Sequence, residues 1–276
     1  MTSRRLDGRR VLVALVFTPL FYLLVRYAPP FGFFALVTTA AMLALAEFYK
    51  LYFREQGVPK TGMVLGLGAV IVLLMSMQWP FIMPEHAAFL VILMALLLYR
   101  VYSRRGFNQS LVESAVLIVG PLYIGLTLGH LLLTRSLADG AFLIFFVFLV
   151  TWASDTGAYY VGTSLGRRKL SPVMSPNKTV EGLLGGLLLG LISALVARIW
   201  FLPSFTVVDC VITGLLLPMA GLVGDLAESA LKRSAGVKDS GWVLPGHGGM
   251  LDRIDSLLLT APTFYYYVFL VKGLSA

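Results

Sequence analysis

Long apolar runs separated by short polar breaks extend along almost the whole chain. Nine of the runs reach the length of about 18–20 residues that spans the hydrocarbon core of a bilayer. Because lipid offers no partner to backbone N–H and C=O groups, runs of this length are expected to be helices. The pattern therefore predicts an all-α, polytopic integral membrane protein with about nine transmembrane helices, at about 11–28, 31–53, 62–79, 81–99, 112–134, 139–161, 181–202, 206–231 and 250–271.

The polar stretches between the runs are too short to form a large soluble domain. Residues 1–276 are therefore predicted to form a single transmembrane domain. Within it, we assign the spans of residues 1–135 to packing or dimer contacts and those of 136–276 to catalysis, because the candidate chemistry described below lies in the second part. The glycines Gly185, Gly186 and Gly190 favour close packing of their helix against a neighbour.

Composition agrees with a membrane protein. The chain is 58% hydrophobic with a mean hydropathy of +0.85, against roughly 45–50% apolar residues in soluble domains. Its one cysteine, Cys210, excludes an intrachain disulfide and a cysteine-rich metal cluster, and it is expected to be a buried small side chain.

The net charge of +8 has a better explanation than nucleic-acid binding. With the N-terminus in the cytoplasm and the first span retained, all but four of the 22 lysines and arginines fall on the cytoplasmic side. This asymmetry follows the positive-inside rule, and such loops face anionic lipid headgroups. It predicts a multi-pass protein whose basic loops face the cytoplasm, with no nucleic-acid partner; the four exceptions are Arg26, Arg135, Arg198 and Lys272. We expect the membrane to be a bacterial-type inner (cytoplasmic) membrane, with the candidate site facing the cytosol.

Charged residues are concentrated between the last two predicted spans. In a chain with only 13% charged residues, ionisable groups beside lipid-facing segments are functional candidates. Four polar residues at the end of the eighth span share one helical face, since they lie at i, i+3, i+4 and i+7. The alternative is a salt-bridged stripe against a neighbouring helix. These four are Asp225, Glu228, Ser229 and Lys232.

The ninth span begins with Asp252, Asp255 and Ser256, again on one face. The plainer alternative is that acidic groups here only complement the helix dipole. Carboxylates from two helices nevertheless suit Mg²⁺, which prefers oxygen ligands and is commonly shared with substrate phosphates. Basic side chains nearby would hold the phosphates of a substrate; they are Lys232, Arg233, Lys238 and Arg253.

A glycine-rich loop joins these two helices. Glycines permit close approach of the backbone to a ligand, and amides that precede a helix can hold an anion. His247 lies between glycines, which favours phosphate contact or proton transfer over a plain turn residue. The glycines concerned are Gly246, Gly248 and Gly249.

Earlier segments on the same predicted side add candidates. Asp155 lies near the cytoplasmic end of the sixth span, and Asn177 and Lys178 precede the seventh, where amides and a cation could hold phosphate. Glu181 could equally bind substrate or serve only as a partner in helix capping.

The stretch from Ser229 to Asp255 resembles the signature of CDP-diacylglycerol synthases, also called phosphatidate cytidylyltransferases. It reads SALKRSAGVKDSGWVLPGHGGMLDRID, with about a dozen matching positions. Supporting matches are SDTGAY at 154–159, SPNKTVEG at 175–182 and GDLAES at 224–229. The resemblance covers roughly the last 125 residues, whereas the first half matches in its pattern of spans and in length.

The resemblance implies transfer of a cytidylyl group from CTP to phosphatidic acid, with Mg²⁺ and with room for a second cation, by a homodimer. It implies that Asp225 and Asp252 bind the metal with Asp255 nearby. A cytidylyltransferase for another lipid phosphate, or an ion-coupled transporter using Asp155 and Asp225, remains an alternative. The expected catalytic residues are Asp225, Lys232, Arg233, Lys238, Asp239, His247, Asp252, Arg253 and Asp255, and those expected at the substrate are Asp155, Asn177, Lys178, Glu181, Glu228, Ser229, Gly246, Gly248 and Gly249.

Overall fold

The computed structural model describes residues 19–54, 57–103, 110–237, 241 and 249–274. Residues 11–18 of the first predicted span lie outside these ranges, and its residues 19–27 are helical. Five of the predicted site residues also lie outside them, namely Lys238, Asp239, Gly246, His247 and Gly248.

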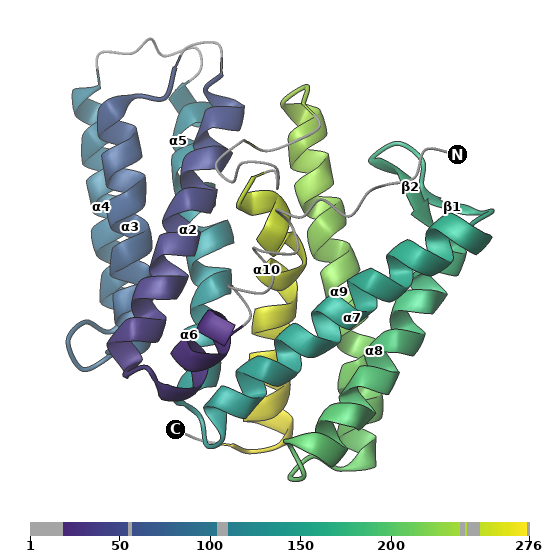
Figure 1. The fold of residues 1–276 in the computed structure, drawn as a ribbon. Coiled ribbons are helices and arrows are strands. Elements are labelled where there is room, and N and C mark those ends of the chain that lie inside the picture. Colours follow the sequence, from purple (N-terminus) through teal and green to yellow (C-terminus); the bar gives the residue numbers. More distant parts are fainter. Residues whose placement is uncertain (1–18, 55–56, 104–109, 238–240, 242–248, 275–276) are drawn as a thin grey trace.

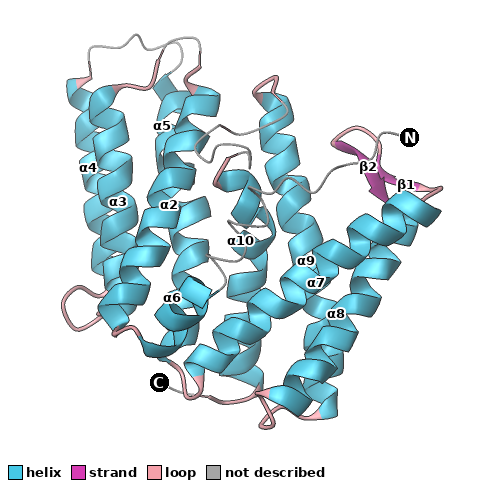
Figure 2. Ribbon diagram, viewed as in Figure 1, coloured by secondary structure: helices cyan, strands magenta, loops and turns pink. Residues whose placement is uncertain are grey.

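The described residues form an almost entirely helical protein, which confirms the predicted fold class (Figure 2). Eight helical segments are long and apolar enough to cross a membrane, and they match the second to ninth predicted spans within a few residues. The first predicted span, and with it the total of nine, stays a prediction. The eight segments are Pro30–Tyr52 (α2), Lys60–Gln78 (α3), Glu85–Tyr102 (α4), Leu111–Ser136, Gly140–Leu165 (α7), Val180–Trp200 (α8), Val207–Ser234 (α9) and Leu251–Val271.

Two of these segments contain π-helical turns. The segment Leu111–Ser136 consists of α5 (Ser110–Gly120), the π turn η2 (Pro121–Leu126) and α6 (Thr127–Ser136). The last segment consists of α10 (Leu251–Tyr266) and the π turn η3 (Tyr267–Val271). Both remain continuous helical passages through the bundle.

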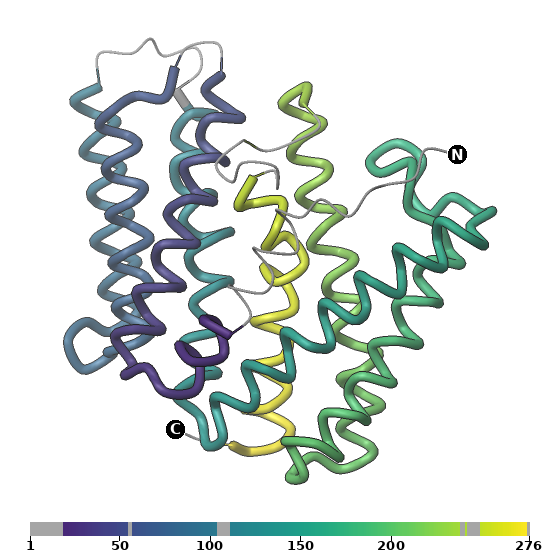
Figure 3. The backbone as a smooth tube through the Cα atoms, viewed as in Figure 1, coloured from purple at the N-terminus to yellow at the C-terminus, as the bar shows by residue number. Residues whose placement is uncertain are grey.

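The helices form two groups with α9 and α10 between them (Figure 1). Helices α2, α3, α4 and α5 stand together on one side, and α7 and α8 cross the other side as a pair. The smooth trace shows that α10 begins lower in the bundle than the ends of α2 and α9 (Figures 1 and 3). The start of α10 is thereby recessed between neighbouring helices.

A short antiparallel hairpin, which the sequence did not lead us to expect, leads into α8. It pairs β1 (Lys169–Ser171) with β2 (Ser175–Thr179), and Lys169 lies opposite Thr179. Thr179 then caps α8, since its hydroxyl accepts a hydrogen bond from the Gly182 amide at 3.1 Å. The hairpin and the cap together place Lys178 on β2, two residues before the start of α8.

Helices α7 and α8 approach each other through glycines, as the small residues of α8 predicted. A Cβ added at Gly157 would lie 2.5 Å from the carbonyl oxygen of Gly185, and one at Gly186 would lie 3.1 Å from that of Ser154. Gly190 is similarly close to Pro218 of α9. Such contacts let backbones pack where larger side chains would separate them.

We expect Gly157→Val to lower the melting temperature of the purified protein in detergent, because its side chain would force α7 away from the Gly185 backbone. Gly68→Ala is the matched control, since a Cβ there meets nothing within 4 Å in the middle of α3. A valine variant as stable as the alanine control would contradict this role for the α7–α8 contact.

A polar cluster ties the bundle together at the end opposite the candidate site. Thr206 and Asp209 form a capping box at the start of α9. The Asp209 carboxylate also accepts a hydrogen bond from the Tyr267 hydroxyl at 2.7 Å and pairs with Lys272 at 2.8 Å. Asp209 is therefore a buried carboxylate with a structural role.

Candidate active site

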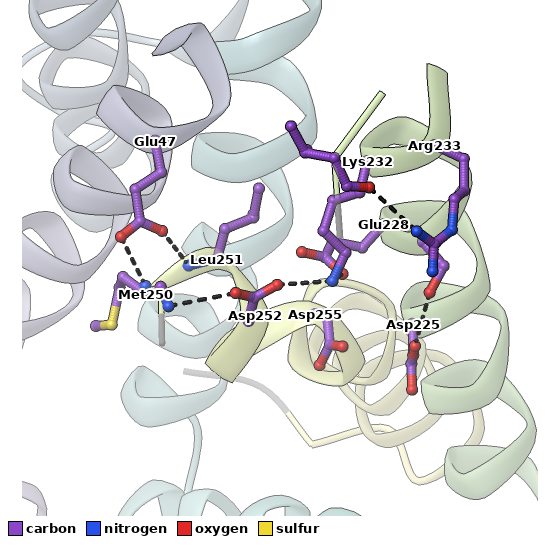
Figure 4. A network of polar contacts seen from close by, with 12 residues as sticks. Glu47, Asp225, Glu228, Lys232, Arg233, Met250, Leu251, Asp252 and Asp255 are labelled. Atoms are coloured by element: carbon purple, nitrogen blue, oxygen red, sulfur yellow. Dashed lines mark hydrogen bonds and ion pairs between the residues drawn. The ribbon is translucent and has the colours of Figure 1, made fainter. Parts of the chain in front are cut away.

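Helices α9 and α10 cross where α9 carries glycines. A Cβ at Gly224 would lie 2.5 Å from the carbonyl oxygen of Asp255, and one at Gly221 would meet Ser256 at 3.5 Å. This close crossing brings the polar face at the end of α9 against the first turns of α10. Figure 4 shows the resulting network of charged side chains.

Lys232 connects two carboxylates from different helices. Its Nζ lies 2.5 Å from Glu228 one turn earlier on α9 and 2.6 Å from Asp252 of α10. Glu228 is completely buried, and the side chains of Lys232 and Asp252 are 14% and 20% exposed. We call these three residues the Lys232 cluster. A pair or triad of this kind tolerates burial only while every charge keeps its partner.

Asp225 belongs to a second group, which is more open. It pairs with Lys178 of β2 and accepts a hydrogen bond from the Ser229 hydroxyl at 3.3 Å. Asp155 of α7 and Asp255 of α10 both lie within electrostatic range of Asp225 and Lys178. We call the four residues Asp155, Lys178, Asp225 and Asp255 the Asp225 cluster.

The Asp225 cluster has the chemistry of a partial cation site. Its three carboxylates offer oxygen ligands and outnumber its one lysine, and the Asp225 side chain is 33% exposed. Among the described residues, no three acidic or histidine side chains already surround a position for a metal ion. Mg²⁺ needs no such cage, because it is commonly held by one or two carboxylates together with water and substrate phosphates. The donor set therefore fits Mg²⁺ shared with a substrate.

The start of α10 is held by carboxylates rather than by its own cap. Met250 provides no capping side chain, and Asp252 accepts a hydrogen bond from the Gly249 amide at 3.2 Å. The amides of Met250 and Leu251 each donate to the Glu47 carboxylate of α2 at 2.9 Å (Figure 4). We did not single out Glu47 from the sequence. It is the only acidic residue of the predicted span 31–53, and an acidic residue in such a span is itself an indication of function.

The Glu181 carboxylate binds backbone amides at the end of α7 rather than a side chain of either cluster. Its carboxylate accepts hydrogen bonds from the backbone amides of Arg167 and Arg168 at 3.0 and 3.1 Å. This geometry favours the structural alternative over contact with substrate, since the carboxylate joins the end of α7 to the start of α8.

Three other described candidates are exposed. Arg233 is exposed, and its guanidinium donates to the carbonyl oxygen of Val237 at 3.3 Å. Arg253 is exposed on the first turn of α10, and Asn177 is exposed on β2. The structure thus brings nine of the predicted residues into the two clusters or into contact with them: Asp155, Lys178, Asp225, Glu228, Ser229, Lys232, Gly249, Asp252 and Asp255.

Carboxylates and lysines from four elements thus form an ionic site at one end of a membrane-spanning bundle. Comparison with known proteins identifies the family of the chain. Residues 8–271 match the model of the cytidylyltransferase family, and the chain belongs to that family.

Individual relatives agree with this assignment. A phosphatidate cytidylyltransferase of Bacillus subtilis is 36% identical over 279 residues, which cover 96% of this chain and 97% of that protein. One of Staphylococcus saprophyticus is 41% identical over 202 residues, covering 73% of this chain and 76% of the relative. One of Staphylococcus aureus is 37% identical over 226 residues, covering 80% and 84%.

Proposed function

We propose that this protein transfers the cytidylyl group of CTP to phosphatidic acid, forming CDP-diacylglycerol and pyrophosphate with Mg²⁺. The observation that carries the proposal is the Asp225 cluster of a chain in the cytidylyltransferase family. In this cluster Lys178 pairs with Asp225, and the carboxylates of Asp155 and Asp255 lie within electrostatic range of both. We propose phosphatidic acid as the lipid substrate because the relatives bear the name phosphatidate cytidylyltransferase.

The chemistry requires no nucleophile from the protein. A phosphate oxygen of phosphatidic acid forms a bond to the α-phosphorus of CTP. The bond from that phosphorus to the oxygen between the α- and β-phosphates breaks, and this oxygen leaves with pyrophosphate. Since the attacking oxygen is already charged, catalysis comes from positioning and from neutralising phosphate charge. Lys178 and Lys232 are suited to that work, because each carries its positive charge beside carboxylates at the site.

Asp225, Asp252 and Asp255 are the proposed Mg²⁺ ligands. Bound Mg²⁺ would neutralise charge on the CTP phosphates and orient them. Asp225 and Asp255 belong to the cluster that holds more carboxylates than lysines, together with Asp155. Asp252 bonds to Lys232, so it would have to exchange that partner for the ion. A second cation is part of the same proposal.

We assign roles to the other predicted residues from their positions in the structure or from the family resemblance. Glu228 is buried and acts on substrate through Lys232. Arg233, Arg253 and Asn177 are exposed, and we assign them to contacts with substrate phosphates. The residues outside the described ranges complete the proposal as groups of the loop before α10: Lys238, Asp239, Gly246, His247 and Gly248.

We also propose an orientation with this site on the cytosolic side of a bacterial-type inner membrane. The asymmetry of lysine and arginine supports that side, where CTP is available. The lipid tails of phosphatidic acid would stay among the helices while its phosphate reaches the site. A homodimer and the surrounding membrane lipids are the expected partners.

Purified protein in detergent, supplied with CTP, phosphatidic acid and Mg²⁺, is expected to release pyrophosphate and form CDP-diacylglycerol in equal amounts. Removing divalent cations with EDTA should stop both, and added Mg²⁺ should restore them. Parallel assays with a prenyl phosphate and with lysophosphatidic acid identify the acceptor. Failure to form any CDP-lipid would refute the proposed function, and turnover with another lipid phosphate alone would refute its substrate.

A further inference from the structure

Glu47 is an almost completely buried carboxylate in a helix remote in sequence from the charged stretch. It lies five residues before the end of α2, and its relative exposure is 1%. A buried carboxylate is costly unless hydrogen bonds or charges compensate it. Its partners therefore indicate why the chain keeps an acid at this depth.

Two of those partners are the backbone amides of Met250 and Leu251, where α10 begins. Glu47 Oε1 accepts from Met250 and Oε2 from Leu251, both at 2.9 Å. The amides in the first turn of a helix have no partner inside the helix, and the dipole makes that end favourable for negative charge. Charge-assisted hydrogen bonds to a carboxylate are the strong kind. Glu47 thus supplies from another helix a cap that Met250 does not provide.

The same carboxylate also lies against Gly241. A Cβ added at Gly241 would be 3.0 Å from Glu47 Oε1 and 3.1 Å from its Cδ. A larger residue at 241 would therefore press on the carboxylate. Glu47 contacts the chain both at Gly241, after α9, and at Met250, where α10 begins.

Asp252 is the next residue along the chain after these two amides. It lies on the turn that Glu47 holds, and from there it reaches Lys232 and the Gly249 amide. Figure 4 shows Glu47 and Lys232 on opposite sides of Asp252, so the α10 turn is secured from α2 and from α9. A shift of this turn would move Asp252 relative to Lys232 and alter the Lys232 cluster.

We infer that Glu47 is a positioning residue, which sets the place of Asp252 in the active site by holding the amides of Met250 and Leu251 at the start of α10 from helix α2. The expected effect on kcat rests on the proposed function, whereas the hold of Glu47 on the start of α10 does not depend on it. It gives the N-terminal half of the chain a direct part in the site.

Glu47→Gln tests this role, because glutamine has nearly the same shape but offers one acceptor oxygen and turns an NH₂ group toward an amide donor. We expect kcat for pyrophosphate release to fall about 10- to 100-fold, the range typical for partners that orient active-site ligands. The KM for phosphatidic acid should change less than kcat. Hydrogen–deuterium exchange without substrate should increase in peptides covering residues 249–253 and stay unchanged in α3 and α4.

Asp209→Asn is the matched control. Asp209 is also a buried carboxylate at a helix start, but it lies at the opposite end of the bundle with Tyr267 and Lys272. This variant should lower the melting temperature while kcat per folded protein stays that of the wild type. If Glu47→Gln behaves in the same way, with a lower melting temperature and normal kcat, its role is structural only and the inference is wrong.

Gly241→Ala leaves Glu47 unchanged, but the added methyl group would press on its carboxylate and displace it. This variant therefore tests the inference if Glu47→Gln does not fold. It should reduce kcat in the same direction by a smaller factor and increase exchange over residues 249–253. Unchanged exchange and unchanged kcat would overturn the inference. If the wild-type protein forms no CDP-lipid, the proposed function fails, but the exchange measurements still confirm or refute the hold of Glu47 on α10.

Discussion

Asp225→Asn is expected to lower kcat roughly 100- to 1,000-fold, as does loss of other preorganised electrostatic groups at active sites. Asparagine preserves the size of the side chain but removes the negative charge that pairs with Lys178 and lies beside Asp155 and Asp255. The site would then hold a cation less well, and Lys178 would lose its partner. Pyrophosphate release at saturating CTP and phosphatidic acid measures the effect, and a titration with Mg²⁺ should show a higher requirement for the ion.

Asp139→Asn provides the same substitution away from the site. Asp139 is exposed, precedes α7 at the opposite end of the bundle and has φ of 58°. Asparagine tolerates this left-handed conformation well, so the control should keep wild-type kcat and stability. Wild-type turnover in Asp225→Asn would remove Asp225 from the proposed catalytic residues.

Lys232→Met is expected to affect both stability and turnover. It leaves the buried Glu228 carboxylate facing Asp252 without the ammonium that now lies 2.5 and 2.6 Å from them. Breaking a buried ion pair by removing one partner typically costs about 3–5 kcal/mol. Thermal unfolding in detergent should show a clearly lower midpoint, and pyrophosphate release should be lost.

The double variant Lys232→Met with Glu228→Gln separates the two effects. Neutralising Glu228 removes the uncompensated buried charge, so stability should recover in part, whereas turnover should not recover without the lysine. Lys60→Met is the control, because Lys60 is exposed at the start of α3 and such changes usually stay within about 0.5 kcal/mol. A Lys232→Met protein as stable as this control would show that the Lys232 cluster contributes nothing to the fold.

The local pattern of the charged stretch was predictable because helical spacing is regular. The i, i+4 positions of Asp225 and Ser229, and of Glu228 and Lys232, predicted contacts that the structure contains. The closeness of α7 and α8 likewise followed from small residues such as Gly185. The i, i+4 contacts depend on one helix alone, and small residues allow close packing whichever helix lies beside them.

Helical spacing could not predict which carboxylate joins the Lys232 cluster and which joins the Asp225 cluster. Spacing placed Asp252 and Asp255 on one face of a helix, but the structure directs Asp252 to Lys232 and leaves Asp255 with Asp225 and Asp155. The crossing of α9 and α10 at Gly224 decides which side chain meets which helix. Helical periodicity contains no information on that crossing.

The sequence by itself determined that this chain crosses a membrane repeatedly and that its ionic groups gather near the last two spans, because hydrophobicity and spacing act locally along the chain. Only the tertiary structure decided that Glu47, some two hundred residues earlier, holds the first turn of α10. The physical reason is that a buried carboxylate and the amides of a helix start satisfy each other only when packing brings them together. No periodicity or motif within α2 specifies which helix start its one acid will meet.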